Sequence, residues 1–169
     1  YMFNAGRGSY EEAQNTLKMI DETREKLASI INTNKNNVVF TSSATESLDN
    51  IIYGLQLKEG DNVYVSPFEH NAVIRPLHSL KVNIIQIPFD NISWELKENE
   101  LKDLMLLNKP KCVIISHISN VTGFELPYKK IFEISKNNNA INVLDSAQGY
   151  GIYSIVKNNI DFIVFAGHK

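Results

Sequence analysis

The stretch that decides the fold is Phe162-Ile163-Val164-Phe165-Ala166-Gly167-His168-Lys169, in which an apolar run of strand length leads directly into a turn and a lysine. A second apolar run, Ile141-Asn142-Val143-Leu144, leads into Asp145-Ser146-Ala147-Gln148. Short, bounded apolar runs of this kind are typical of buried strands in a parallel sheet. We therefore expect two buried strands, one of which delivers the carboxylate of Asp145 and the other the amine of Lys169.

Short apolar runs alternate with amphipathic patterns along most of the chain. We expect strands at residues 38–40, 63–65, 84–87, 113–117, 141–144 and 162–165, and helices at residues 45–55, 71–80, 96–107 and 128–136. Parallel strands need crossover connections of about a dozen residues, which helices supply. The chain is therefore predicted to be an α/β protein with an open, mostly parallel sheet and helices on both faces.

One further helix is predicted ahead of the sheet, over residues 9–31. Ser9 and Glu12 have the spacing of a capping box. Apolar residues then recur at helical spacing as far as Ile30, and the asparagine-rich residues 32–37 are expected to end the helix.

Composition excludes several classes of protein. The 169 residues, 43% of them hydrophobic, suffice for one globular unit with a core. The net charge is -2 and no basic stretch is dense enough to follow a phosphate backbone, so we expect no nucleic acid partner. The apolar runs are too short to span a membrane, and no secretion leader follows Tyr1. A single cysteine, Cys112, precludes an internal disulfide, and we expect a cytoplasmic protein.

Polar clusters follow five of the predicted strands, and open α/β sheets bind ligands beyond the carboxyl ends of their strands. The clusters are Thr41–Glu46 after Phe40, Glu69–Asn71 after Val65, Ser119–Gly123 after His117, Asp145–Gln148 after Leu144 and Ala166–Lys169 after Phe165. We expect all five to meet at one edge of the sheet.

Each cluster has a functional and an ordinary interpretation. Residues 41–46 can present the N-H groups of a helix N-terminus to a phosphate, or simply cap the helix. His70 can stack on an aromatic cofactor or satisfy a helix end, and Asn120 can bind a phenolic oxygen or lie in a polar loop. Asp145 can bind a ring nitrogen or cap a helix, and Lys169 can be a solvated lysine.

Nucleotide and metal motifs are missing from the sequence. No GxxxxGK occurs, and Gly6-Arg7-Gly8 follows no predicted strand and lacks a third glycine. The four histidines have no ligand spacing and Cys112 has no partner thiol, so we expect no metal site. Cys112 begins a predicted strand and is expected to be a small buried hydrophobic residue.

The joint pattern fits the chemistry of pyridoxal phosphate. This cofactor needs a lysine that bonds to its aldehyde and a carboxylate that keeps its pyridine nitrogen protonated, so that the ring withdraws electrons from the substrate. Gln148, three residues after Asp145, can reach the same ligand. A phosphate turn, an imidazole, an amide, a carboxylate and a lysine at successive strand ends favour this site over five coincidences.

The same ordered set resembles the class V aminotransferase family, and within it the cysteine desulfurase and selenocysteine lyase group. The matching stretches are FTSSATESL at residues 40–48, EHNAV at 69–73 followed by RPL at 75–77, SHISNVTG at 116–123, DSAQGYG at 145–151 and FAGHK at 165–169. The resemblance implies the large-domain fold of type I pyridoxal phosphate-dependent transferases.

The resemblance also implies a role for each site residue, with Lys169 and His70 as the catalytic residues. Ala44 and Thr45 would bind the cofactor phosphate, and His168 would lie beside it. His70 would stack on the pyridine ring, Asp145 would bind the ring nitrogen, and Asn120 and Gln148 would contact the ring hydroxyl. Lys169 would form the covalent bond. Ala166 departs from the family, because many relatives have a phosphate-binding serine there. Binding of the phosphate should therefore be weaker here, or the hydrogen bond of the missing serine should be replaced by His168 and the turn at Thr45.

The implied reaction is that of a cysteine desulfurase, which removes sulfur from L-cysteine, leaves alanine and forms an enzyme-bound persulfide. Alternatives are another class V reaction, namely transamination, lyase chemistry or epimerisation, or an inactive fragment that serves as an interaction module. The resemblance implies that residues 1–169 are part of the large domain. An N-terminal segment, the rest of that domain, the small domain, the substrate-binding arginine and the nucleophilic cysteine would lie outside it, and Cys112 is not expected to be that nucleophile.

The resemblance further implies a homodimer and a sulfur-acceptor protein as partners. A molecule that ended at Lys169 would lack packing neighbours for its sheet, so we expect it to be inactive and prone to self-association.

Overall fold

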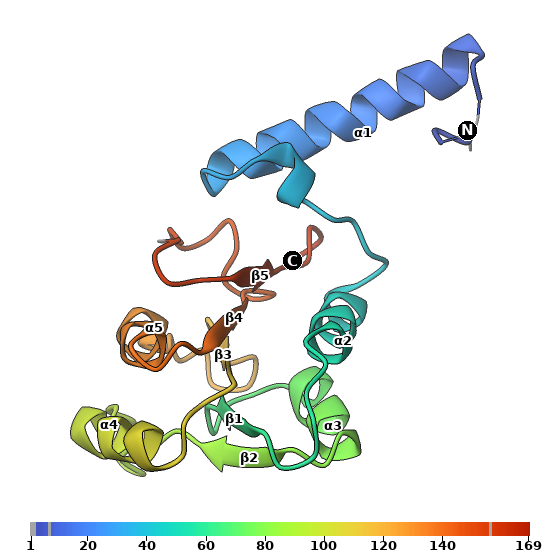
Figure 1. Ribbon diagram of the computed structural model, residues 1–169. Coiled ribbons are helices and arrows are strands. Elements are labelled where there is room, and N and C mark those ends of the chain that lie inside the picture. The colour runs from blue at the N-terminus through green and yellow to red at the C-terminus, as the bar shows by residue number, and fades with distance from the viewer. Residues whose placement is uncertain (1–2, 7, 156) are drawn as a thin grey trace. The chain divides into compact units, whose positions relative to one another are not determined.

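The computed structural model describes residues 3–6, 8–155 and 157–169. The chain divides into two compact units, Tyr1–Phe40 and Thr41–Lys169. The first unit contains a long helix, α1 (Glu11–Ile30), and a short 3-10 helix, η1 (Lys35–Asn37). The second unit contains the whole sheet and the four helices that cover it (Figure 1).

Two predictions for the first unit were wrong. The N-cap of α1 is Tyr10, and it makes no side-chain capping bond, so Ser9 and Glu12 form no capping box. The acidic side chains of the first turn favour this helix end through the helix dipole instead. Residues 38–40 form no strand, because none of the described strands pairs with them and a single extended segment cannot satisfy its own backbone groups.

The predicted parallel sheet is confirmed. Its five strands are β1 (Asn62–Val65), β2 (Asn83–Gln86), β3 (Cys112–Ser116), β4 (Ile141–Asp145) and β5 (Phe162–Val164). They pair in the order β2-β1-β3-β4-β5, and every pairing is parallel. The chain leaves β1 toward β2 and then returns to place β3 on the other side of β1. In open α/β sheets such a reversal of strand order opens a crevice at the carboxyl edge, where ligands bind.

Helices cover both faces of the sheet, as predicted. On one face α2 (Ala44–Gly54) and α3 (Asn71–Ser79) pack on alternate strand residues such as Val63 and Ile114. On the other face α4 (Glu98–Leu107) and α5 (Tyr128–Lys136) pack on the intervening residues, such as Tyr64. Figure 1 shows the two helix pairs on opposite sides of the strands. The core therefore consists of two apolar layers separated by the sheet.

A buried polar network anchors the segment between β4 and β5. The side chain of Asn142 is fully buried, and its Oδ1 accepts a hydrogen bond of 2.6 Å from the Ser135 hydroxyl. Its Nδ2 donates to the carbonyl oxygens of Phe132 and Asn159, at 3.3 and 2.7 Å. The Asn142 N-H donates to the Asp161 carboxylate at 2.8 Å. These bonds fix the chain immediately before β5.

Cys112 begins β3 and is fully buried, as predicted. Burial raises the pKa of its thiol to about 12, so the thiol stays protonated at neutral pH. Within the described ranges, no helix is both long and apolar enough to cross a membrane.

Candidate functional site

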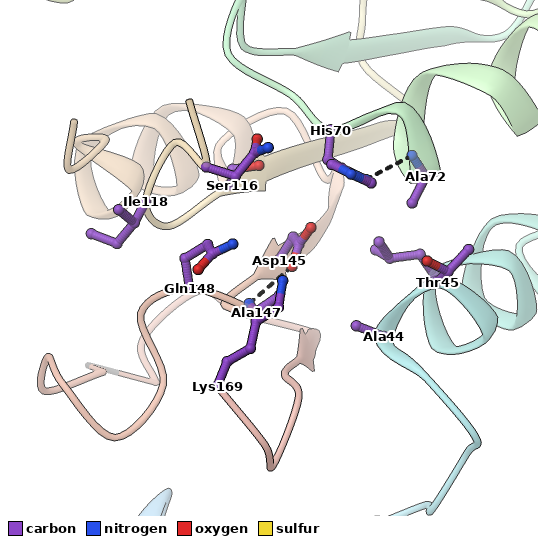
Figure 2. A pocket seen from close by; sticks show the side chains of 12 residues that line it. Ala44, Thr45, His70, Ala72, Ser116, Ile118, Asp145, Ala147, Gln148 and Lys169 are labelled. Carbon is purple, nitrogen blue, oxygen red and sulfur yellow. Dashed lines mark hydrogen bonds between the residues drawn. The ribbon is translucent and has the colours of Figure 1, made fainter. Parts of the chain in front are cut away.

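One pocket lies at the carboxyl edge of the sheet, and seven of the eight residues predicted for the site line it (Figure 2). These seven are Ala44, Thr45, His70, Asn120, Asp145, Gln148 and Lys169. They follow β1, β3, β4 and β5 or begin α2. The first polar cluster therefore reaches the pocket without a preceding strand, because it is carried there by the N-terminus of α2.

Asp145 is the last residue of β4 and lies at the centre of the site (Figure 2). The residue is only 7% exposed, and its Oδ1 accepts the Ala147 N-H at 3.0 Å. Burial raises the pKa of this carboxyl, whereas the Ala147 hydrogen bond and the charges of His70 and Lys169 lower it. The second carboxylate oxygen accepts no hydrogen bond from any of the described residues. It is available to a proton donor in the pocket.

Lys169 reaches the pocket on the turn that follows β5. Its backbone N-H donates to the Ala166 carbonyl at 3.3 Å, which closes the turn. Figure 2 shows its side chain beside Asp145, on the same pocket. Asp145, a buried acid, and Lys169, an exposed residue with an amine, therefore line the same pocket.

The N-terminus of α2 forms another wall. Ser43 is the N-cap, and its hydroxyl accepts the Glu46 N-H at 3.1 Å. Glu46 in turn accepts the Ser42 N-H at 2.7 Å, and its hydrogen bonds with Ser42 lower the pKa of its carboxyl. The N-H groups of Ala44 and Thr45 make no hydrogen bond within the described part of the chain. Capping therefore accounts for Ser43, and two N-H groups remain for an anion.

His70 has the ordinary role considered for it, that of a helix cap. It is the N-cap of α3, and its Nδ1 accepts the Ala72 N-H at 3.1 Å. This bond requires the neutral ring to carry its proton on Nε2. The ring also lines the pocket (Figure 2).

Asn120 and Gln148 enter from the turns after β3 and β4. The Asn120 turn is closed by an N-H to carbonyl bond from Gly123 to Ser119 at 2.9 Å, and Gly123 has a φ of 72°. A positive φ is the conformation that glycine adopts without strain, as expected for a tight turn. His168 is exposed and lies outside the residues that line the pocket. Its contact with a phosphate stays a prediction.

Sequence reasoning missed several residues of the pocket and its support. The missed lining residues are Leu48, Ala72, Ser116, Ile118 and Ala147. Glu69 was passed over as the neighbour of His70, although its carboxylate binds the end of β3. The available signal for Ser116 was a hydroxyl directly after the apolar residues 112–115.

His117 was also missed, and it supports the turn that carries Asp145 and Gln148. The ring is fully buried, and its Nδ1 lies 3.1 Å from the Ser146 hydroxyl. Burial lowers the pKa of this imidazole, while the carboxylate of Glu125 raises it. Gly149 lies so close that an added Cβ would be 2.4 Å from Nδ1. The turn is therefore packed directly onto a buried imidazole.

The chemical groups that line the pocket suit a flat anionic ligand with a protonated ring nitrogen. Among the described residues, the pocket offers N-H groups without a partner at one end, a carboxylate oxygen without a partner in the centre and an amine beside it. The enclosed volume is about 80 Å³, below the roughly 300–1,000 Å³ of typical small-molecule sites. A cofactor held here would be only partly covered by these residues. No group of three His, Cys, Asp or Glu side chains among the described residues could hold a metal ion.

The whole chain, residues 1–169, matches the family model for class V aminotransferases. The chain belongs to the class V aminotransferase family. The resemblance inferred from the strand-end motifs is thus confirmed.

Relatives of this chain include the probable cysteine desulfurase of Methanothermobacter thermautotrophicus, which is 29% identical over 100% of the chain and 43% of the relative. The probable cysteine desulfurase of Mycoplasma genitalium is 34% identical over 92% of the chain and 40% of the relative. The apo structure of the cysteine desulfurase from Thermococcus onnurineus NA1 matches with a TM-score of 0.86 and 27% identity, over 97% of this chain and 42% of that one. The predicted fold is confirmed, and the chain spans about two fifths of the length of these relatives.

Proposed function

We propose that this class V aminotransferase chain is the cofactor-binding part of a pyridoxal phosphate-dependent cysteine desulfurase. The observation that carries the proposal is that Asp145, Lys169 and the N-terminus of α2 line one pocket. Curated relatives named as probable cysteine desulfurases support the choice of reaction. The products would be alanine and a persulfide on the enzyme.

The residues present fit the cofactor. The free N-H groups of Ala44 and Thr45 would bind its phosphate, and the free carboxylate oxygen of Asp145 would accept the proton of its ring nitrogen. Bound pyridoxal phosphate would supply a protonated ring that withdraws electrons from the α-carbon of the substrate. Burial would strengthen the Asp145 interaction, because water competes little for the carboxylate of a residue that is 7% exposed.

Lys169 and His70 would be the catalytic residues. The Lys169 amine would hold the cofactor covalently and, once released by the substrate, would accept the proton of the substrate α-carbon at Nζ. His70 would cover one ring face, held by the bond from Ala72. Asn120 and Gln148 would bind the ring hydroxyl, and His168 would approach the phosphate from the exposed turn.

The sulfur-accepting cysteine must come from elsewhere in the complete protein. Cys112 is unsuited to the role, because it is buried and burial raises its thiol pKa to about 12. We infer that residues 1–169 form part of the large domain, and that further large-domain residues and a small domain supply this cysteine and the substrate-binding arginine. A cytoplasmic homodimer that passes sulfur to an acceptor protein completes the proposal.

A different class V reaction, such as transamination, lyase chemistry or epimerisation, is the second candidate. The observation that favours it is that the residues assigned to the pocket would all serve the cofactor, and no described lining residue is a cysteine or an arginine. Supplying cysteine to the complete protein and measuring sulfide and alanine separates the two. Release of both products supports desulfuration, whereas neither product from a cofactor-loaded protein contradicts it.

The visible spectrum of the protein titrated with pyridoxal phosphate tests the cofactor site. We expect a yellow band that borohydride removes in the wild type and in the control Lys81→Ala, whose lysine is 73% exposed. Lys169→Ala should lack the band, and the activity of the complete protein should fall about 10²–10⁴-fold because its proton acceptor is lost. A borohydride-sensitive band of normal intensity in Lys169→Ala would contradict the proposal.

A further inference from the structure

Glu69 has no role in the chemistry proposed above, yet its carboxylate joins the ends of two strands at the pocket. Its Oε1 accepts hydrogen bonds from the Ser66 hydroxyl at 2.5 Å and from the Ser116 N-H at 2.9 Å. Its Oε2 accepts the Ser116 hydroxyl at 2.7 Å. Ser66 and Ser116 are only 2% and 5% exposed. The carboxylate therefore has three protein donors in a nearly closed environment.

The Glu69 carboxylate takes the place of a strand beyond the end of the ladder between β1 and β3. The register of these strands ends at Val65 opposite Ile114, so the Ser116 N-H lies past the last paired residue. The chain turns away after β1, and Glu69 returns to accept that N-H. On its other side, Ser116 pairs with Asp145 in the ladder between β3 and β4. Glu69, Ser116 and Asp145 thus form one line across the carboxyl edge.

The same bonds fix the residue next to Glu69, which is His70. The loop between β1 and α3 is held at its start by Ser66, whose hydroxyl also accepts the Phe68 N-H at 3.2 Å. It is held at its end by the bond between His70 and Ala72. Between these points, Glu69 ties the loop to β3. Without that tie the loop would be joined to β3 only through the ladder between β1 and β3, which ends at Val65.

We propose that Glu69 is a positioning residue, which joins the β1 loop to the end of β3 and thereby sets the place of His70 relative to Asp145 in the pocket. This inference rests on the proposed function only for the identity of the ligand. Burial raises the pKa of the Glu69 carboxyl to about 7, whereas the hydrogen bonds from Ser66 and Ser116 favour its charged form and lower that pKa.

Hydrogen exchange of the cofactor-free protein tests whether Glu69 binds the end of β3. Glu69→Gln keeps the shape but removes one acceptor oxygen, and Glu69→Asp keeps the charge on a shorter side chain. We expect both to speed exchange of the Ser116 N-H about tenfold or more, the effect of losing one charge-assisted hydrogen bond. The matched control is Glu59→Gln, because the Glu59 side chain is 76% exposed and its ion pair with Lys81 is long, at 4.0 Å. It should leave that rate unchanged.

Titration with pyridoxal phosphate then tests the effect on the pocket. Both Glu69 variants should bind it about tenfold more weakly, with altered circular dichroism of the bound cofactor, which reports the arrangement of groups around its ring. Unchanged Ser116 exchange, or unchanged affinity and dichroism, in a folded Glu69→Gln or Glu69→Asp would overturn the inference. Failure of the wild type to bind pyridoxal phosphate would instead overturn the proposed function. The exchange result would still show whether Glu69 holds the β1 loop to β3.

Discussion

At the residue scale, Gly149 determines how closely the turn that carries Asp145 can approach the buried His117 ring. An added Cβ would lie 2.4 Å from His117 Nδ1, and the ring has little room because it packs edge-on against Tyr128 and Tyr153. We expect Gly149→Ala to lower the free energy of unfolding by about 1–3 kcal/mol through overpacking. It should also weaken binding of pyridoxal phosphate, since the turn must shift. Denaturant unfolding and a visible titration measure the two effects.

Gly54→Ala is the matched control for that variant. Gly54 lies at the end of α2, and a Cβ there would meet no atom within 4 Å. An alanine should therefore be neutral or should stabilise the helix by up to about 1 kcal/mol. Equal destabilisation by the two substitutions would show that close packing against His117 is not the cause.

Residue types and their order along the chain were enough to predict most of the pocket lining. Asp145 stands directly after an apolar run, and Lys169 and His70 follow such runs by short turns, so their convergence follows from parallel pairing. Glu69 and His117 could not be predicted in the same way. Their partners, Ser116 and Ser146, are 47 and 29 residues away, and only the folded sheet brings them together.

At the element scale, the Asn142 network determines how β5 is joined to β4. The Asn142 side chain is fully buried and makes three hydrogen bonds, including one of 2.7 Å to the carbonyl of Asn159 in the loop before β5. We expect Asn142→Leu to lower the free energy of unfolding by about 2–4 kcal/mol, because it leaves buried polar partners unsatisfied. Denaturant unfolding measures the change. Asn83 is exposed, so the control Asn83→Leu should lower the free energy of unfolding by less than about 1 kcal/mol. A similar decrease in both variants would contradict the role of burial.

Helices and strands of the second unit were predicted within a few residues because each has a strong apolar pattern and a partner to pack on. α5 was predicted over residues 128–136, as observed. The prediction failed at residues 38–40, where the β-branched pattern is real but no strand lies alongside. A three-residue apolar run cannot indicate whether such a partner exists.

At the scale of the whole molecule, the pH dependence of folding reflects buried groups with opposite effects. Burial lowers the pKa of His117 below its ordinary value of 6.5, so the unfolded chain binds a proton in a range where the folded chain does not. This group therefore makes the free energy of unfolding fall as the pH is lowered below about 6.5. Burial raises the pKa of Glu69 and Asp145, so these carboxyls favour the folded state as the pH is lowered.

Comparison of variants isolates the contribution of His117. Denaturant unfolding at a series of pH values should show a smaller stability loss between about pH 7 and pH 5 in His117→Gln than in the wild type. His78 is exposed, so the control His78→Gln should leave the dependence of the free energy of unfolding on pH as in the wild type. A slope in His117→Gln equal to that of the wild type would show that the buried imidazole is not responsible.

The all-parallel order of the strands has a kinetic consequence. No two of the described paired strands are joined by a hairpin, so every ladder closes only after an intervening segment of 16 residues or more, the shortest being residues 146–161 between β4 and β5. Chains dominated by such distant pairings collapse into their native topology slowly, on a scale of about milliseconds to seconds. Newly synthesised polypeptide would thus spend appreciable time with unpaired strand edges exposed, and such edges promote aggregation. Chaperones would therefore assist its folding in a crowded cell.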